Sequence, residues 1–418
     1  MFKKVAATVI LITMAIVPAI AQDIDFNIMG TGARARGMGG AFIGVADDAT
    51  AVGWNPAGIA QLEKMEASVV GLFNMKKFSY EETYSDYPEY NDQWDQSVNH
   101  FAPAFASFII PTKMADKNLV FAVAYQRMID MGYVYKDNDV DAYGVEYDYE
   151  EKTTGGLDAI TPALALQVTP QIMVGLAGNI LINGYKTEEN ETYPAYPSDY
   201  WNYTMESDLS GFNMNAGFLG TFNKINIGAM FRLPFTMTEK YTEDLSYSFG
   251  GTTYLSSETS PDIEITMPFM FGFGVALKPT DKLTIAADFE SRPYSSSEVT
   301  VEGETDEIGY KDCNQFRVGM EYIMSGSNSV FPIRLGFRTD PRVYTGWYGD
   351  GTDTSQVVGK VITGGVGLVM GKLMLDLAYE YTMANHVDVN FTDPYIGSYT
   401  AKSDEASHNI MASAIIHF

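Results

Sequence analysis

The chain has 418 residues and a formal net charge of −26, with 53 Asp and Glu residues against 27 Lys and Arg residues. This balance excludes nucleic acid as a partner, because binding to phosphates needs clustered Lys and Arg. The single cysteine, Cys313, excludes a fold held together by internal disulfides.

The first 21 residues have the pattern of a targeting segment. Lys3 and Lys4 form a positive start, an apolar stretch runs over residues 5–17, and residues 19–21 offer a small-residue cleavage site. The apolar stretch is shorter than the roughly 20 residues that a membrane-spanning helix needs. We therefore expect residues 1–21 to be a cleaved signal peptide, with a retained signal anchor as the alternative.

Residues 22–64 do not alternate between polar and apolar side chains as a strand does. They are rich in glycine, but no Gly-Lys-Ser/Thr or dinucleotide-binding spacing follows a strand, so a phosphate-binding loop is not indicated. Asp47 or Asp48 can cap one short helix, and Asn55, with Pro56 in the first turn, can begin another. We expect these residues to form a compact hatch of short helices, of a size that fits the lumen of a β-barrel.

From about Glu66 onward the side chains alternate between polar and apolar, which is typical of strands with one face outward and one inward. We count 14 such segments, an even number as in bacterial single-chain barrels. They begin near Glu66, Asn99, Asn118, Asp158, Gln171, Glu206, Lys224, Pro261, Lys282, Lys311, Val330, Val357, Lys372 and Glu405.

The connections between these segments alternate between short and long, as expected for short periplasmic turns and long outer loops. The long ones span 79–98, 130–157, 186–205, 239–260, 292–310, 340–356 and 384–403, and hold 32 of the 53 acidic residues. We expect a solvated acidic surface there. Bridging divalent cations are an alternative, but Asp137-x-Asp139-x-Asp141 has Ala142 where a calcium-binding loop requires Gly, so no metal site is predicted.

Together these patterns predict an all-β fold, a 14-stranded antiparallel transmembrane β-barrel over residues 65–418, plugged by the hatch of residues 22–64 and located in the outer membrane. A soluble β-sandwich or propeller is the alternative. It would have loops of similar length at both ends and no strongly polar second face.

If the apolar face points outward, several charged residues point into the lumen. Opposite charges on neighbouring strands can pair, so they form either an ion-pair ladder that holds the wall and the hatch or a polar translocation track. A catalytic carboxylate pair is disfavoured because no His or nucleophile accompanies it. The residues are Asp288, Glu290, Arg317, Glu321, Arg334, Arg338, Asp376 and Glu380.

Other inward positions hold methionine, whose flexible side chain suits a pocket for varied hydrophobic ligands and equally suits packing against a plug. We expect the candidate ligand-binding residues to be these methionines together with apolar residues of the N-terminal segment. They are Phe26, Ile28, Met29, Met173, Met230, Met270, Met374 and Met411.

The hatch segment contains three motifs, which span Arg36–Ala41, Ala46–Ala49 and Asn55–Gly58. Their sequence and spacing resemble the FadL/TodX family of outer-membrane transporters for hydrophobic compounds. The resemblance implies a 14-stranded barrel and ligands such as long-chain fatty acids or aromatic hydrocarbons. It also implies a hatch that contains Gly37, Gly39, Gly40, Asn55, Pro56 and Ala57.

The family releases its ligand sideways at a kinked third strand. The third strand predicted here, from Asn118 to Asp130, has no Pro or Gly, so the second strand, with Pro103, is the nearest substitute. Further prolines at Pro162, Pro234, Pro268 and Pro332 should cause bulges or gaps in the sheet.

The sequence thus favours passive transport of a hydrophobic small molecule by a protein surrounded by outer-membrane lipid. No cofactor is expected, because no nucleotide motif is present. A second hypothesis is a partner in protein secretion or surface attachment, since the same motifs resemble PorV-like barrels. A membrane hydrolase is disfavoured because no Ser/His pair occupies a credible strand position.

Overall fold

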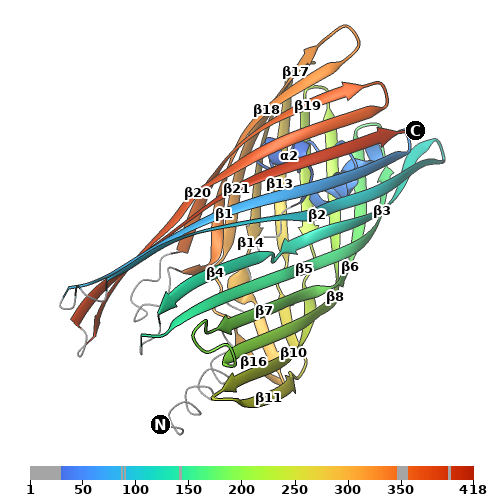
Figure 1. The fold of residues 1–418 in the computed structure, drawn as a ribbon. Coiled ribbons are helices and arrows are strands. Elements are labelled where there is room, and N and C mark those ends of the chain that lie inside the picture. Colours follow the sequence, from blue (N-terminus) through green and yellow to red (C-terminus); the bar gives the residue numbers. More distant parts are fainter. Residues whose placement is uncertain (1–29, 86–87, 89–90, 141–143, 346–355, 394–396) are drawn as a thin grey trace.

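A computed structural model describes residues 30–418 except 86–87, 89–90, 141–143, 346–355 and 394–396. The described strands form one antiparallel sheet that closes on itself as a ring of 14 strands around three short hatch helices (Figure 1). The ring closes where β1 pairs with β21, from Glu66↔His417 to Tyr84↔Tyr399. The predicted fold, a 14-stranded barrel with an N-terminal hatch, is confirmed.

The hatch contains the α-helices α2 (Ala33–Gly37) and α3 (Ala51–Trp54) and the 3-10 helix η1 (Pro56–Gln61), and a further 3-10 helix, η3 (Tyr294–Ser296), follows β14. In the first half of the chain the strands are β1 (Glu66–Tyr84), β2 (Asp92–Met114), β3 (Lys117–Asp130), β4 (Tyr133–Val140), β5 (Glu146–Gln167), β6 (Ile172–Ile182), β7 (Gly184–Thr192), β8 (Tyr200–Phe222), β9 (Ile225–Arg232) and β10 (Phe235–Phe249). They continue with β11 (Thr252–Thr259), β12 (Ile263–Met267), β13 (Met270–Thr280), β14 (Leu283–Arg292), β15 (Glu298–Val301), β16 (Glu304–Glu307), β17 (Cys313–Ser325), β18 (Val330–Thr345), β19 (Gln356–Met370), β20 (Leu373–Asp393) and β21 (Gly397–His417). Within the described residues no helix is long and apolar enough to cross a membrane.

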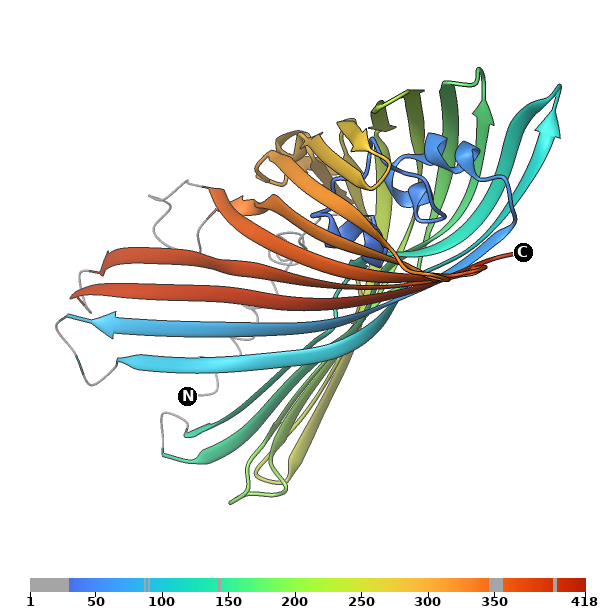
Figure 2. The same cartoon turned by 90° about the horizontal axis from the view of Figure 1, so that it is seen from above.

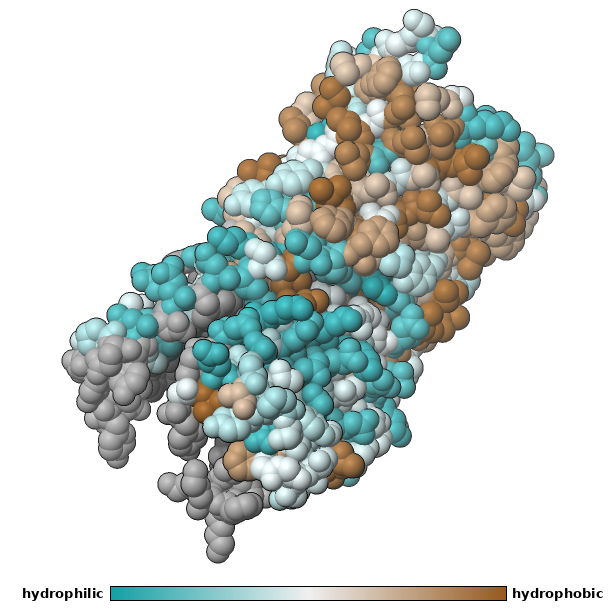
Figure 3. Space-filling model, in the orientation of Figure 1, coloured by the Kyte–Doolittle hydropathy of each residue, from teal (hydrophilic) through white to brown (hydrophobic). Residues whose placement is uncertain are grey.

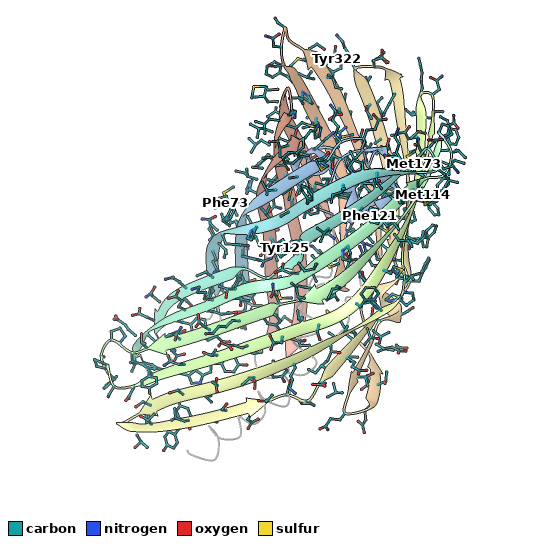
Figure 4. All side chains as sticks on the ribbon, turned by 90° about the vertical axis from the view of Figure 1, so that its right-hand side faces the viewer. Phe73, Met114, Phe121, Tyr125, Met173 and Tyr322 are labelled. Carbon is teal, nitrogen blue, oxygen red and sulfur yellow. The ribbon has the colours of Figure 1, made fainter. Side chains whose placement is uncertain are left out.

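An apolar band surrounds the end of the barrel that has the short turns. Figure 3 shows it as a brown surface, whereas the opposite end is hydrophilic. Its side chains come from alternate strand positions, such as Phe73, Phe121 and Tyr322, which are labelled in Figure 4 and are 38%, 47% and 46% exposed. A closed sheet can expose such a band to lipid because all of its backbone groups are paired within the sheet.

The prediction of seven long loops was wrong, because the connections between the strands are shorter than expected. Most of their residues extend the strands beyond the apolar band: β1 continues to Tyr84, and β10 and β11 are joined by Gly250 and Gly251 alone. Outside the membrane neither strand face meets lipid, so polar residues occupy both faces and the alternation that marks a strand is lost.

The acidic residues of these extensions are more than a solvated surface. Tyrosine hydroxyls donate hydrogen bonds to several carboxylates, such as Tyr203 to Glu243 at 2.6 Å and Tyr185 to Glu239 at 3.0 Å. Glu239 is only 1% exposed. The extensions therefore continue the barrel wall and are stabilised by their own side-chain hydrogen bonds.

Candidate functional site

Asn55 joins the hatch to the barrel wall. Its side-chain oxygen accepts a hydrogen bond from the backbone N–H of Ala57 at 3.2 Å, which caps η1 as predicted, with Pro56 in the first position of the helix. Its amide nitrogen donates to the carbonyls of Ile43 in the hatch and Phe218 in β8, both at 2.9 Å. Asn55 is fully buried, so water cannot replace these bonds.

Asp48 does not cap a helix as the sequence suggested. The N-cap residue of α3 is Thr50, and Asp48 instead accepts hydrogen bonds from the backbone N–H and the hydroxyl of Thr50, at 2.9 and 2.5 Å. The capping residue is shifted by two positions because the side chain of Asp48 closes the turn before the helix. Burial raises the pKa of Asp48, and the nearby guanidinium of Arg34 opposes this shift.

Glycines in the wall let the hatch backbone approach the strands directly. They stand opposite one another in three cross-strand pairs, on β6 and β8, on β9 and β13, and on β17 and β18. A Cβ atom added at any of them would lie within 3.0 Å of a hatch atom. The pairs are Gly175 with Gly217, Gly228 with Gly274, and Gly319 with Gly336.

The glycines predicted for the hatch belong to its own surface, which faces the wall. Gly39 has a positive φ of 68° and meets the backbone of β18, and Gly37 lies against Gly365 of β19. Gly40, with a φ of 78°, completes the turn after α2, where its N–H donates to the carbonyl of Ala35. Positive φ favours glycine at Gly39 and Gly40, and at Gly37 an added Cβ would lie 3.2 Å from the Cα of Gly365.

The charged residues predicted to face the lumen do so, and all of them except Asp288, which accepts hydrogen bonds from the backbone N–H groups of Phe42 and Ile43, form ion pairs. The Nε of Arg34 in the hatch binds Glu321 of β17 at 3.0 Å, and Glu321 also binds Arg334 of β18 at 2.7 Å. Likewise, Arg36 and Arg338 share Glu380 of β20. Because breaking a buried pair leaves an uncompensated charge, the ladder fixes one side of the hatch to β17, β18 and β20.

The five candidate methionines do not form one pocket. Met173 and Met411 pack in the same buried cluster as the hatch, Met230 is buried on β9, and Met374 is half-buried at the start of β20. Met270 belongs to a separate buried cluster. Phe26, Ile28 and Met29 lie outside the described residues.

That separate cluster lines the lumen on the side of the hatch that faces the strand extensions, and we call it the lumen cluster. It draws on hydrophobic residues of strands from β3 to β18, and buried polar residues such as Glu239 and Arg292 lie beside it. Its members are Ile129, Leu157, Ala159, Leu181, Tyr185, Met205, Leu209, Phe235, Met237, Tyr241, Ile263, Ile265, Met267, Met270, Tyr294, Ile308, Tyr310, Cys313 and Val343.

A polar cavity lies between the hatch and the wall. Its lining is dominated by arginine and amide side chains, and sequence reasoning missed it. The lining residues are Gly30, Thr31 and Gly53 of the hatch, Gln126, Arg127 and Met128 of β3, Asn179 of β6, Asn215 of β8 and Arg232 of β9. The strand alternation places Arg232 inward, so the signal was present in the sequence.

The wall has a seam between β2 and β3. Their backbone pairing runs from Met114↔Lys117 to Phe105↔Gln126 and stops there, although β2 continues for 13 more residues along β1. Figure 2 shows β2 (cyan) diverging from β4 and β5 (teal) beyond this point. Pro103 lies next to the end of the pairing, at a bulge in the β1–β2 register.

Side chains bridge the seam. His100 of β2 contacts Asp130 of β3, and the amide nitrogen of Gln96 donates to the carbonyl of Val134 in β4 at 3.0 Å. Phe101 of β2 is 68% exposed, so the seam begins within the apolar band. The sequence predicted a disturbance at Pro103 but gave no sign of these bridges.

The other four prolines also interrupt the sheet. Pro234 separates β9 from β10, Pro268 separates β12 from β13, and Pro162 and Pro332 fall where one of the flanking pairings is broken. Among the residues that the structure describes, no group of three or more His, Cys, Asp or Glu side chains is placed to hold a metal ion.

Comparison with known proteins gives a match over nearly the whole chain. The family described as outer membrane protein transport protein (OMPP1/FadL/TodX) matches residues 12–418. No curated protein sequence matches significantly. Among solved structures, a Pseudomonas aeruginosa FadL homologue is similar at 13% identity, with a TM-score of 0.64, over 94% of this chain and 100% of the other.

Two further solved structures are similar over 94% of this chain. The P. putida toluene transporter TodX has 13% identity and a TM-score of 0.62, with 99% of its chain covered. The Ralstonia pickettii toluene transporter TbuX has 14% identity and a TM-score of 0.54, with 100% of its chain covered. At these identities the similarity shows a shared fold.

Proposed function

Since the chain belongs to the OMPP1/FadL/TodX family of outer-membrane transport proteins, we propose that it is a passive channel for small hydrophobic molecules such as long-chain fatty acids or aromatic hydrocarbons. The resemblance inferred from the hatch motifs is confirmed by this membership. The proposal includes no catalytic step and no cofactor.

The observation that carries the proposal is the lumen cluster. The interior of a water-filled barrel is polar, whereas here a cluster of 19 buried hydrophobic residues lies in the lumen beyond the hatch. Such a surface stabilises a hydrophobic molecule by roughly 25 cal/mol for each Å² of apolar area removed from water. Of the methionines expected to bind ligand, Met270 is the one within this cluster, so it is the one we retain in the proposed path.

We propose the seam between β2 and β3 as the sideways exit. Backbone pairing is absent there, so only side-chain contacts such as His100 with Asp130 need to separate. Between β17 and β18 or between β19 and β20, by contrast, an opening in the apolar band would break a ladder of backbone hydrogen bonds. The seam also begins beside the exposed Phe101, where a hydrophobic molecule would meet lipid directly.

Uptake of labelled oleate and toluene by cells that lack their own hydrophobic transporter tests the proposal. Leu209→Gln together with Met237→Gln places polar groups in the lumen cluster and should lower uptake. Asp208→Asn on the outer face of the same strand should not. If the wild-type chain carries neither compound above a vector control, the transport proposal fails and the secretion-partner hypothesis takes its place.

A further inference from the structure

Six neighbouring strands carry different charges on their two faces. β4, β5, β7, β8, β10 and β11 pair in this order, and their outer parts belong to the strand extensions (Figure 1). Together they have four lysines and no arginine, and the register places all four lysines on the face that points away from the lumen. These are Lys136, Lys152, Lys186 and Lys240. The inner face of these described strands therefore has no basic side chain.

Carboxylates and tyrosine rings share this inner face. On β10, Glu239, Tyr241 and Glu243 point inward at every second position, and Glu239 and Tyr241 are only 1% and 8% exposed. Glu258 of β11 stands directly opposite Glu243. Tyr185 of β7 and Tyr203 of β8 donate hydrogen bonds to Glu239 and Glu243. We call these residues the aromatic–carboxylate surface: Tyr185, Tyr203, Glu239, Tyr241, Glu243 and Glu258.

The carboxylates of this surface have no cationic partner. Glu239 accepts hydrogen bonds from the hydroxyls of Tyr185 and Ser207, at 3.0 and 2.6 Å, and both donors are neutral. In the part of the chain that the structure describes, no Lys, Arg or His nitrogen lies within 4.0 Å of Glu239, Glu243 or Glu258. Like charges directly opposite each other destabilise a sheet, and a buried charge is costly unless it is paired. The surface therefore calls for a positively charged ligand.

A metal ion does not fit this surface. Glu239 and Glu243 are four residues apart on one strand, so their Cα atoms lie about 13 Å apart, with Tyr241 between them. The acidic groups of the described residues include no set of three that is placed to hold a metal ion. An organic cation has a larger head group, and the faces of aromatic rings attract it, most strongly where water is excluded. The arrangement thus fits an ammonium group that contacts rings and carboxylates together.

The surface continues directly into the lumen cluster. Tyr185 and Tyr241 belong to both. Met205 of the cluster stands opposite Glu243, and Met237 lies two positions before Glu239 on the same face of β10. A ligand whose charged head lies at the surface would therefore have its chain among apolar side chains.

We propose that the aromatic–carboxylate surface binds organic cations that carry an apolar chain, such as alkyl or aromatic ammonium compounds, and prefers them to neutral compounds of the same chain length. This inference rests on the proposed transport function for the path beyond the surface. It deepens that function, because it assigns a charged class of ligand to the outer end of the lumen.

The test measures binding of radiolabelled decyltrimethylammonium and decanol to the full-length protein in a nonionic detergent at low ionic strength. The quaternary nitrogen keeps its charge at every pH and donates no N–H hydrogen bond, so its binding reports charge and ring contacts. The wild type should bind it about tenfold more tightly than decanol. Glu243→Gln together with Glu258→Gln should abolish this preference. Tyr203→Leu should weaken it, whereas Tyr203→Phe, which keeps the ring, should retain it.

Asp208→Asn together with Asp244→Asn is the matched control. It removes the same number of negative charges, but from exposed positions on the outer face of β8 and β10, so the preference should survive. A loss as large as that in the Glu243→Gln and Glu258→Gln variant would mean attraction by net charge alone and would overturn the inference. Heat-modifiable migration on gels verifies that each variant is folded.

Equal binding of the two compounds by the wild type, or a preference that survives Glu243→Gln with Glu258→Gln, would also overturn the inference. So would displacement of the ammonium compound by equimolar Ca²⁺, because the carboxylates would then hold a metal ion. Toluene uptake separates this inference from the proposed function. If toluene is carried but the cation is not preferred, transport stands and cation binding fails; if the cation is preferred but nothing is carried, cation binding stands and the transport proposal fails.

Discussion

Replacing Asn55 with Ala should loosen the hatch while the barrel remains folded. The change removes the cap of η1, which typically contributes about 1 kcal/mol. It also removes the hydrogen bonds that the Asn55 amide donates to the carbonyls of Ile43 and Phe218, at about 1 kcal/mol each. The expected total is about 3 kcal/mol for the local anchor, which is small beside the backbone ladder of 14 paired strands.

Hydrogen exchange measured by mass spectrometry gives the direct readout. A local cost of about 3 kcal/mol corresponds to roughly a hundredfold faster exchange of the amides that the anchor protects, above all the N–H of Ala57. Exchange in β8, apart from the region of Phe218, should stay slow. Uptake of oleate should change as well, because the hatch fills the lumen through which a ligand would pass.

Asn118→Ala is the matched control. Asn118 also donates to two hatch carbonyls, those of Ala60 and Leu62, both at 2.8 Å, but it is only half-buried. Water can replace its bonds, so its effect on exchange should be much smaller. Equal effects of the two substitutions, or unchanged exchange in Asn55→Ala, would refute the reasoning that burial makes this anchor strong.

Three further perturbations test other parts of the structure. Burial raises the pKa of Glu189 in the strand extensions, so the ionised carboxylate destabilises the folded state at a pH above this pKa. Glu189→Gln should therefore increase the protease resistance of the extension at about pH 8 but not at about pH 4. Gly319→Ala should lower the stability of the folded protein by about 1–3 kcal/mol and expose the hatch to protease, because the added Cβ would lie within 3.0 Å of hatch backbone. Gly364→Ala is the control and should be neutral, because an added Cβ there has no neighbour closer than 3.9 Å. Joining His100→Cys and Asp130→Cys with a short thiol cross-linker, in a background without the native cysteine, should lower uptake of oleate; full uptake after cross-linking would rule out the seam as the exit.

The sequence predicts the parts of this molecule that depend on alternation or on a local motif. All 14 strands were found because lipid on one face and the lumen on the other impose period-2 patterning in the apolar band. The cap at Asn55 was found because Asn followed by Pro is a local signal for the start of a helix. Both features can be seen within a few consecutive residues.

The parts that were missed depend on residues far apart in the chain. The strand extensions lack alternation, so they were taken for loops. The pairing of Gly228 with Gly274 against the hatch, and the contact of His100 with Asp130, require the register of the closed sheet.

The paired glycines have a consequence for the order of assembly. Three glycine pairs are spread over about half of the ring, from β6 to β18. At each of these glycines the wall has no side chain, and the hatch backbone occupies the space. A hatch that arrived after closure would have to enter a lumen whose walls already fit it closely. Since β1 follows the hatch directly and closes the ring with β21, we expect the hatch to be seated while these two strands are still apart. The strands would then assemble around the hatch, and the pairing of β1 with β21 would enclose it.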